Sequence, residues 1–545
     1  MTTKVPAVSE QEVRSPWNFK HKLLRFITLS ALVLTCTALF SQPIPNFNID
    51  YVGYMQFGAE LNDIWGYVDE QGNEYALVGR ENGFSIIDVT DPSDMENVFG
   101  APGLTTTWRD IKTWGDHAYV TCECFNGLLI VDMSPLPEDN NLTYTYWVGD
   151  TATFYSAHNL YIDDQGYAYI FGANYGNGGA IILDLNQDPM DPTVVGVYDD
   201  HYLHDGVVRN DTLWGGAVYV GEAQTIDVSD KSNPQIITSW KTPSAFTHNM
   251  WYSDDARYLF TTDEVRNAKI AAYDISEPLN PTLVDTWMPN DTGIIPHNTH
   301  YMDQFLITSY YTIGLSILDV TRPNNMVEVG RYDTSPDYHY QGFHGCWGAY
   351  PWLPSGRIIA TDIEKGLYVL EADYQRACYL EGQVTDQHTG NVIFFPEIEL
   401  VEDSQQVEGS IVGKYAMGTL NGGNYTVRVS AEGYYDKVIE NVTLELGKLT
   451  QLDVQLSNWP LGVDEGPRAN QVNVFPNPAT DQLNVVAQEA IESVQLLDLV
   501  GRLHPTEVQL SGNRALVQVA ALDAGHYFLQ VRSAEGVTTK RVIID

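Results

Sequence analysis

The sequence predicts an all-β protein: a seven-bladed β-propeller followed by two small β-sandwich domains. Three observations support this fold class. A short apolar phrase that ends in an acidic residue recurs seven times in the first two thirds of the chain. The composition, with 12% aromatic residues, 44 Gly and 26 Pro, favours strands and turns over long helices. Two further strand patterns, unlike the repeat, follow it. A length of 545 residues accommodates several domains of this kind.

The charge balance excludes one class of function. The chain has 29 Lys and Arg against 71 Asp and Glu, a formal net charge of −42. Such a surface repels phosphate backbones, so we expect no nucleic-acid partner. The five Cys are too few for a disulfide scaffold. The composition indicates an exported β protein.

The repeat has the length of a propeller blade. Typical copies are FSIIDVTDP at 84–92 and LSILDVTRP at 315–323. The intervals between successive copies run from 43 to 52 residues, as expected for four-stranded blades. The acidic residues that close the phrases are Asp88, Asp132, Asp184, Asp227, Asp274, Asp319 and Glu371. The strand pattern at 47–57 resembles that at 326–333 and is expected to supply the outer strand of the last blade, which closes the ring.

The N-terminal segment has the pattern of an export signal. Residues 20–25 are basic, and an apolar run from 26 to 40 stops at Ser41-Gln42. This predicts a signal peptide over 1–42, too short for a comfortable membrane span. No other apolar run reaches membrane length, so we expect a mature protein without a transmembrane segment.

The repeated phrases resemble the LVIVD repeat, and the stretch 43–373 resembles the choice-of-anchor B family. This resemblance implies a propeller joined to a surface anchor, and it implies no established activity.

A polar pair recurs at the predicted start of each blade's first strand, and five of its seven first members are His. Equivalent positions of innermost strands form a ring at one end of the central channel. Imidazoles that converge there suit a transition metal such as Zn, Cu, Fe or Ni. The candidate ligands are His158, His204, His248, His297 and His344.

The same periodicity has a purely structural interpretation. Repeats copy residues whether or not they are functional, and inner-strand His residues also bond between blades, so both interpretations stay open. Cys122 and Cys124 form a C-x-C pair, for which a disulfide or inert thiols are favoured over a metal site. The Asp-rich turns, such as the one that contains Asp184 and Asp188, are expected to cap turns rather than to bind calcium. No G-x-S-x-G elbow, H-E-x-x-H pair or phosphate-binding Gly-rich loop is present, and no catalytic residue is assigned.

Two modules follow the repeats. Residues 376–457 show alternating strands with Gly turns, and GQVTD (382–386) and GNYTVRVSAEGY (423–434) resemble the carboxypeptidase regulatory-like, transthyretin-like domain. After a linker at 458–471, residues 472–545 carry VFPNPATDQLNV (474–485) and LDAGHYFLQV (522–531). This module resembles the C-terminal sorting domain of the type IX secretion system of Bacteroidota. The resemblance implies recognition by that machinery and export across both membranes.

These observations predict a secreted or cell-surface propeller that binds a ligand or partner, with a polysaccharide or a protein as candidate ligands. The alternative is a metal-dependent hydrolase or oxidoreductase with a His-ring site in the propeller channel.

Overall fold

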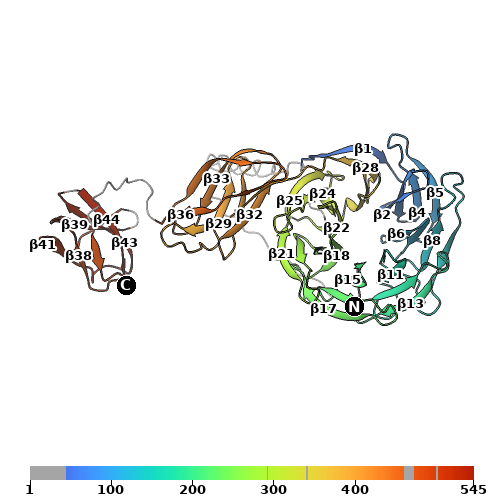
Figure 1. Cartoon of the computed structure of the whole chain (residues 1–545), viewed down its shortest axis with the longest axis horizontal. Coiled ribbons are helices and arrows are strands. Elements are labelled where there is room, and N and C mark those ends of the chain that lie inside the picture. The colour runs from blue at the N-terminus through green and yellow to red at the C-terminus, as the bar shows by residue number, and fades with distance from the viewer. Residues whose placement is uncertain (1–44, 291–292, 339–341, 459–471, 499–500, 535) are drawn as a thin grey trace, which may run out of the picture. The chain divides into compact units, whose positions relative to one another are not determined.

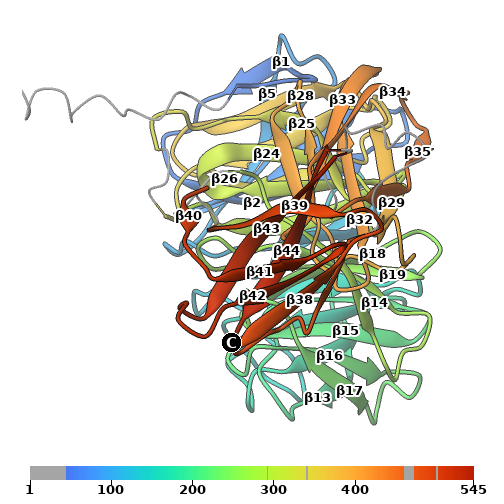
Figure 2. The same ribbon diagram turned by 90° about the vertical axis from the view of Figure 1, so that its left-hand side faces the viewer.

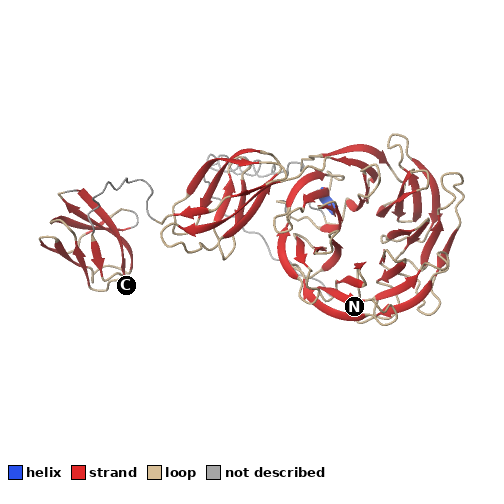
Figure 3. Cartoon of the chain, viewed as in Figure 1, coloured by secondary structure: helices blue, strands red, loops and turns tan. Residues whose placement is uncertain are grey.

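The computed structural model describes residues 45–545 except 291–292, 339–341, 459–471, 499–500 and 535. The predicted signal peptide and most of the predicted linker therefore lie outside the described residues. Strands make up almost all the regular structure (Figure 3), and the one helix in the described part is the short 3-10 turn η1 (Tyr311–Ile313). No helix there has the length and apolar character that a membrane span requires. The chain divides into two compact units, of which the first ends at Leu456 and the second begins at Ser457.

Seven four-stranded antiparallel sheets, the blades, occupy residues 49–372. The first three are β2 (Leu61–Val68), β3 (Glu74–Arg80), β4 (Gly83–Asp88), β5 (Glu96–Pro102); β6 (Ile111–Trp114), β7 (His117–Val120), β8 (Leu128–Asp132), β9 (Tyr144–Trp147); and β10 (Asn159–Ile162), β11 (Tyr167–Phe171), β12 (Ala180–Asp184), β13 (Thr193–Tyr198). The next two are β14 (Gly206–Arg209), β15 (Thr212–Ala217), β16 (Glu222–Asp227), β17 (Gln235–Lys241); and β18 (Thr247–Tyr252), β19 (Tyr258–Asp263), β20 (Ile270–Asp274), β21 (Thr282–Trp287).

The sixth blade is β22 (Pro296–Met302), β23 (Phe305–Tyr310), β24 (Gly314–Asp319) and β25 (Val327–Tyr332). The last combines β26 (Cys346–Tyr350), β27 (Ile358–Asp362) and β28 (Gly366–Ala372) with the N-terminal strand β1 (Ile49–Met55), which pairs antiparallel with β28. The predicted closure by the N-terminal strand is thus confirmed. Figure 1 shows the ring, with β2, β6, β18 and β22 toward its middle and β5, β13, β17 and β21 at its circumference. Figure 2 shows one blade from the side, with β14 to β17 in succession.

The repeated phrase is the third strand of each blade. Its apolar run is buried on both faces, as in β8, where Leu128–Val131 are all buried, because adjacent blades cover it. The acidic residue that ends it caps the following turn. Asp88 Oδ1 accepts a hydrogen bond from the backbone N–H of Thr90 at 2.9 Å, and Asp274 does the same for Ser276 at 3.0 Å. The expected turn-capping role is therefore observed.

The second module packs as two sheets around an apolar core and belongs to the same compact unit as the propeller. Its strands are β29 (Cys378–Asp386), β30 (Glu397–Leu400), β31 (Gln405–Glu408), β32 (Lys414–Thr419), β33 (Gly423–Ser430), β34 (Lys437–Leu444), β35 (Leu449–Gln451) and β36 (Val454–Leu456). Arg322, in the turn after β24, donates two hydrogen bonds of 2.6 and 2.7 Å to the carboxylate of Glu381 in β29.

The last module forms two four-stranded sheets with their own core. Its strands are β37 (Asn473–Phe475), β38 (Gln482–Val486), β39 (Ile491–Asp498), β40 (Leu503–His504), β41 (Val508–Ser511), β42 (Arg514–Gln518), β43 (Gly525–Ser533) and β44 (Gly536–Ile544).

Candidate metal centre in the propeller channel

Four of the five predicted histidines lie together where the first strands begin. The ring centroids of His158 and His204 are 3.9 Å apart, those of His204 and His248 are 4.3 Å apart, and those of His248 and His297 are 4.7 Å apart. They come from four successive blades and line one chamber of the channel, together with Trp108, Arg109 and Trp347. We call this space the histidine chamber.

A local irregularity of the first strand lies at two of these side chains, His248 and His297. The register of β18 against β19 shifts between Thr247 and Asn249, so His248 is the extra residue at a bulge. A similar shift lies between Pro296 and Thr299, next to His297. Bulges redirect side chains and are common beside functional sites.

His344 does not join this group. The register shift in β26 lies between Cys346 and Gly348, which makes Trp347 the counterpart of His248 in the last blade. His344 stacks on Tyr338 at 4.7 Å, and its Nδ1 pairs with Glu364. The ring centroid of Trp347 lies 5.0 Å from that of His297, so in the last blade Trp347 stands where four other blades have a histidine.

Glu264, which the sequence analysis did not single out, completes the cluster. It directly follows β19, and its carboxylate oxygens lie 3.7 Å from His248 Nε2 and 3.9 Å from His297 Nε2. The hydroxyl of Tyr311, in η1, donates a 2.6 Å hydrogen bond to Glu264 Oε1. Ligands of one ion at 2.0–2.2 Å are about 3.2–3.6 Å apart, so the two contacts of Glu264 are within a few tenths of an ångström of that spacing.

The hydrogen bond of His297 fixes its tautomer. Its Nδ1 contacts the carbonyl oxygen of Trp347, which can only accept, so Nδ1 carries the proton. Nε2 then presents a lone pair toward Glu264. A backbone carbonyl that orients a ring in this way is typical of metal-binding histidines.

Burial holds most of the cluster neutral. Desolvation lowers the pKa of His204 and of His248 well below the usual value, with neighbouring imidazoles as a further cause, and it lowers the pKa of His297 to about 4. Desolvation also raises the pKa of Glu264 to about 7. Neutral imidazole is the form that binds metal ions.

His158 differs from its neighbours. Burial by itself lowers its pKa, but the carboxylates of Glu123, Asp205 and Glu264 together outweigh burial, and the pKa is raised. The two side chains form a 2.6 Å contact between His158 Nδ1 and Glu123 Oε1. His158 therefore has a carboxylate partner of its own, while His204, His248 and His297 face the interior of the cluster.

The second members of three pairs have a structural role. Asp63 Oδ2 accepts from the backbone N–H of Ile111 at 3.1 Å, and Asp110 Oδ2 from that of Leu160 at 3.0 Å. Asn249 Oδ1 accepts from Thr299 N at 2.9 Å. In each case the donor N–H belongs to the residue that directly follows the polar pair of the next blade. These residues link blades rather than orient the adjacent imidazoles.

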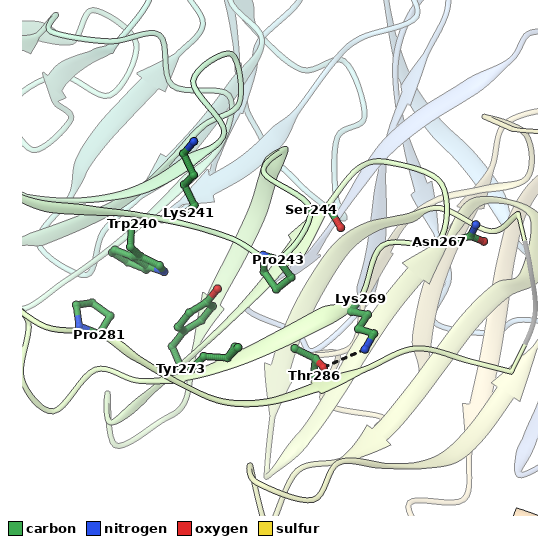
Figure 4. A pocket seen from close by; sticks show the side chains of 10 residues that line it. Trp240, Lys241, Pro243, Ser244, Asn267, Lys269, Tyr273, Pro281 and Thr286 are labelled. Carbon is green, nitrogen blue, oxygen red and sulfur yellow. Dashed lines mark hydrogen bonds between the residues drawn. The ribbon is translucent and has the colours of Figure 1, made fainter. Parts of the chain in front are cut away.

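Other features of the sequence add no ligand to the cluster, although Arg109 lines the chamber. Arg109 is held by the carbonyl oxygens of Arg80 and Leu104, so its guanidinium is not free for an anionic ligand. Cys122 and Cys124 form a disulfide, whereas Cys346 and Cys378 are buried free thiols. A separate hollow between β17 and β21 is lined by Trp240, Tyr273, Pro243 and Pro281, with Lys269 bonded to Thr286 (Figure 4).

Comparisons with known proteins identify the modules. The LVIVD repeat matches residues 71–100, 107–137 and 312–334, the carboxypeptidase regulatory-like domain matches 379–457, and the secretion system C-terminal sorting domain matches 473–545. No curated protein matches the chain. A solved structure, the β-propeller domain of Cps50 (Swd1) from Myceliophteria thermophila, is similar at 13% identity and a TM-score of 0.43, over 59% of this chain and 99% of that chain.

These matches place the protein in a class. It is an LVIVD-repeat β-propeller protein with a carboxypeptidase regulatory-like domain and a type IX sorting domain. The sorting domain indicates interaction with that secretion machinery and export to the cell surface or the exterior.

Proposed function

We propose that the propeller is an exported ligand-binding module whose ligand is a divalent transition-metal ion in the histidine chamber. The ion is held by His248 Nε2, His297 Nε2 and a Glu264 oxygen. The observation that carries the proposal is the convergence of His248, His297 and Glu264, since one ligand atom of each lies within 4.8 Å of the others. Glu264 Oε2 is 3.7 Å from His248 Nε2, and Glu264 Oε1 is 3.9 Å from His297 Nε2. Two imidazoles and one carboxylate form a common ligand set for zinc and for non-haem iron.

The surroundings support metal binding over a simple packing role. Tyr311 orients the carboxylate and the Trp347 carbonyl orients His297, so two ligands have partners that hold them in place. Structural histidines would instead satisfy each other or the backbone. Among the described residues, the carboxylates that pair with His248 are Glu264, at 3.7 Å, and Asp205, at 3.9 Å. Both distances are longer than a hydrogen bond, so neither carboxylate satisfies the ring.

A metal-dependent hydrolase or oxidoreductase is the second candidate. Three protein ligands leave coordination positions for water or substrate, as in catalytic zinc sites. Trp108, which lines the chamber, is 44% exposed and is available to a polysaccharide or protein ligand.

Cobalt titration of the untagged full chain tests the proposal. We expect Co²⁺ to produce visible absorption bands of a bound ion that saturate with added metal and disappear on addition of zinc. Glu264→Gln and His297→Gln should lose the bands, whereas the matched variant His344→Gln should keep them. A chain that folds but gives no bands and retains no metal after dialysis overturns the proposal.

A further inference from the structure

The two ring nitrogens of His248 face two different carboxylates. Nε2 points toward Glu264, 3.7 Å away, and Nδ1 lies 3.9 Å from Asp205 Oδ2. His248 is fully enclosed, with 2% of its surface exposed. Both nitrogens of one buried imidazole are therefore directed at groups that bind metal ions.

The Asp205 side of the ring carries a set of unpartnered atoms. Within the described residues, His204 Nδ1, His248 Nδ1 and Asp205 Oδ1 are buried and have no hydrogen-bond partner. Buried polar atoms without partners are rare in folded proteins, and three side by side require an explanation. One oxygen or nitrogen from each of these residues lies within 4.8 Å of the others.

The atoms are also held in place. Asn249 donates a 3.0 Å hydrogen bond to Asp205 Oδ2, which fixes the carboxylate without using Oδ1. The ring of His204 is enclosed between those of His158 and His248, at 3.9 and 4.3 Å. Glu123 holds His158 on the other side, so His158 is left out of this set.

We infer that the chamber holds two metal ions, and that His248 bridges them as an imidazolate. The first ion is the one of the proposed function, on which this inference rests. The second is bound by His204 Nδ1, a carboxylate oxygen of Asp205 and His248 Nδ1. Its binding displaces the remaining N–H proton of His248, which leaves to solvent, and no electron is transferred.

The bridge explains features that one ion leaves unexplained. A single ion on His248 Nε2 leaves His248 Nδ1 and Asp205 Oδ1 without hydrogen-bond partners among the described residues. A second ion satisfies His204, Asp205 and His248 Nδ1 together. It also offsets the negative charge that the Asp205 carboxylate brings into the interior.

Copper titration of the metal-free, untagged full chain tests the bridge. Electron paramagnetic resonance counts the unpaired spins of bound Cu²⁺, and elemental analysis counts the bound copper. We expect the first equivalent to give close to one spin per copper. The second equivalent should lower the total signal, because an imidazolate couples two Cu²⁺ spins.

Two variants separate the sites. Asp205→Asn and His204→Gln should bind one equivalent with a full spin count and show no loss of signal on further addition. His344→Gln should behave as the unchanged chain. Thermal unfolding of each variant verifies that the fold is retained.

The outcomes are distinct. One equivalent that disappears in Glu264→Gln but is unchanged in Asp205→Asn overturns the second site and leaves the proposed function standing. Two equivalents with fully additive spins overturn the bridge. Absence of bound copper overturns the second site and the proposed function together.

Discussion

The two members of each polar pair share one period and one strand, yet they differ in what they contact. Three second members reach the next blade, as Asp110 does through the backbone N–H of Leu160. The first members His204 and His248 each keep a buried ring nitrogen without a hydrogen-bond partner among the described residues, and so does one oxygen of Asp205, which is a second member. The position within the pair therefore does not decide the role of a residue, whereas the satisfaction of its hydrogen bonds does.

This difference gives a practical rule for repeat proteins. A periodic polar residue that is fully bonded to its neighbours belongs to the scaffold. One that is buried and unpartnered, beside others of the same kind, marks a place where a ligand supplies the missing contacts. If the rule holds, substitutions of bonded residues lower stability and substitutions of unpartnered residues lower metal binding. The expected effects are given from the largest to the smallest.

Asp110→Ala should destabilise the fold most. Asp110 accepts from Leu160 and pairs with the buried ammonium of Lys112 at 3.0 Å. Its removal takes away the carboxylate that pairs with this buried ammonium, which costs about 3–5 kcal/mol of unfolding free energy. Chemical denaturation of the metal-free chain measures this. His204→Gln, at the first position of a pair, is the control and should cost less than about 1 kcal/mol. Equal losses in the two variants would remove the distinction.

Glu264→Gln should act on metal affinity instead. The amide keeps the shape of the side chain but loses the negative charge, and we expect affinity to fall by more than about 100-fold, beyond the range for residues that only orient ligands. Competition with a chelator of known affinity measures the change. The unfolding free energy of the metal-free variant should not decrease. A variant with unchanged affinity would exclude Glu264 as a ligand.

Metal affinity should fall about 10-fold between pH 8 and pH 6, since the pKa of Glu264 is raised to about 7 and protons compete with the ion below it. The metal-free protein should respond in the opposite sense. A raised folded pKa makes this carboxyl stabilising at low pH, and that contribution is lost as the pH rises through about 7. Titrations at fixed ionic strength measure both trends. A pH-independent affinity would contradict the ligand assignment.

Tyr311→Phe should reduce metal affinity about 10-fold, the lower end of the range for residues that orient ligands. The variant loses only the 2.6 Å hydrogen bond to Glu264. The same chelator competition applies, and Tyr338→Phe, whose ring stacks on His344, is the matched control. Identical affinities in the two variants would show that Tyr311 does not position the carboxylate.

His344→Gln should have the smallest effect, within about 0.5 kcal/mol on stability and none on metal content. His344 is bonded to Glu364 and lies outside the histidine chamber. Elemental analysis after dialysis provides the comparison with His248→Gln. Loss of metal from His344→Gln would show that His344 contributes to metal binding.

The fold was predictable because its signals are local and repeated. The apolar phrase, its terminal Asp and the interval between copies each report a buried strand with a capped turn, and the match of 47–57 to 326–333 predicted the closing strand. The two C-terminal modules were recognisable from contiguous motifs for the same reason.

The site was predictable only in part. Four of five histidines were placed together, but in the last blade the position of His248 is taken by Trp347, which lies 347 − 297 = 50 residues after His297. His344 lies 344 − 297 = 47 residues after it, and intervals this similar do not tell the two residues apart.

Glu264 is the counterpart of Glu123 in the second blade, as the strand registers show, but only the folded chain brings Glu264 close to both His248 and His297. The signal that could have found it is the Thr-x-Glu pattern at the end of the second strand in both blades, at 121–123 and 262–264.

Anomalous X-ray diffraction from crystals of the zinc-soaked, untagged chain, recorded on both sides of the zinc absorption edge, tests the metal centre most directly. The account predicts an anomalous peak about 2.0–2.2 Å from His248 Nε2, His297 Nε2 and a Glu264 oxygen. A chamber without anomalous density, in which water bonds to the imidazoles and to Glu264, would contradict it.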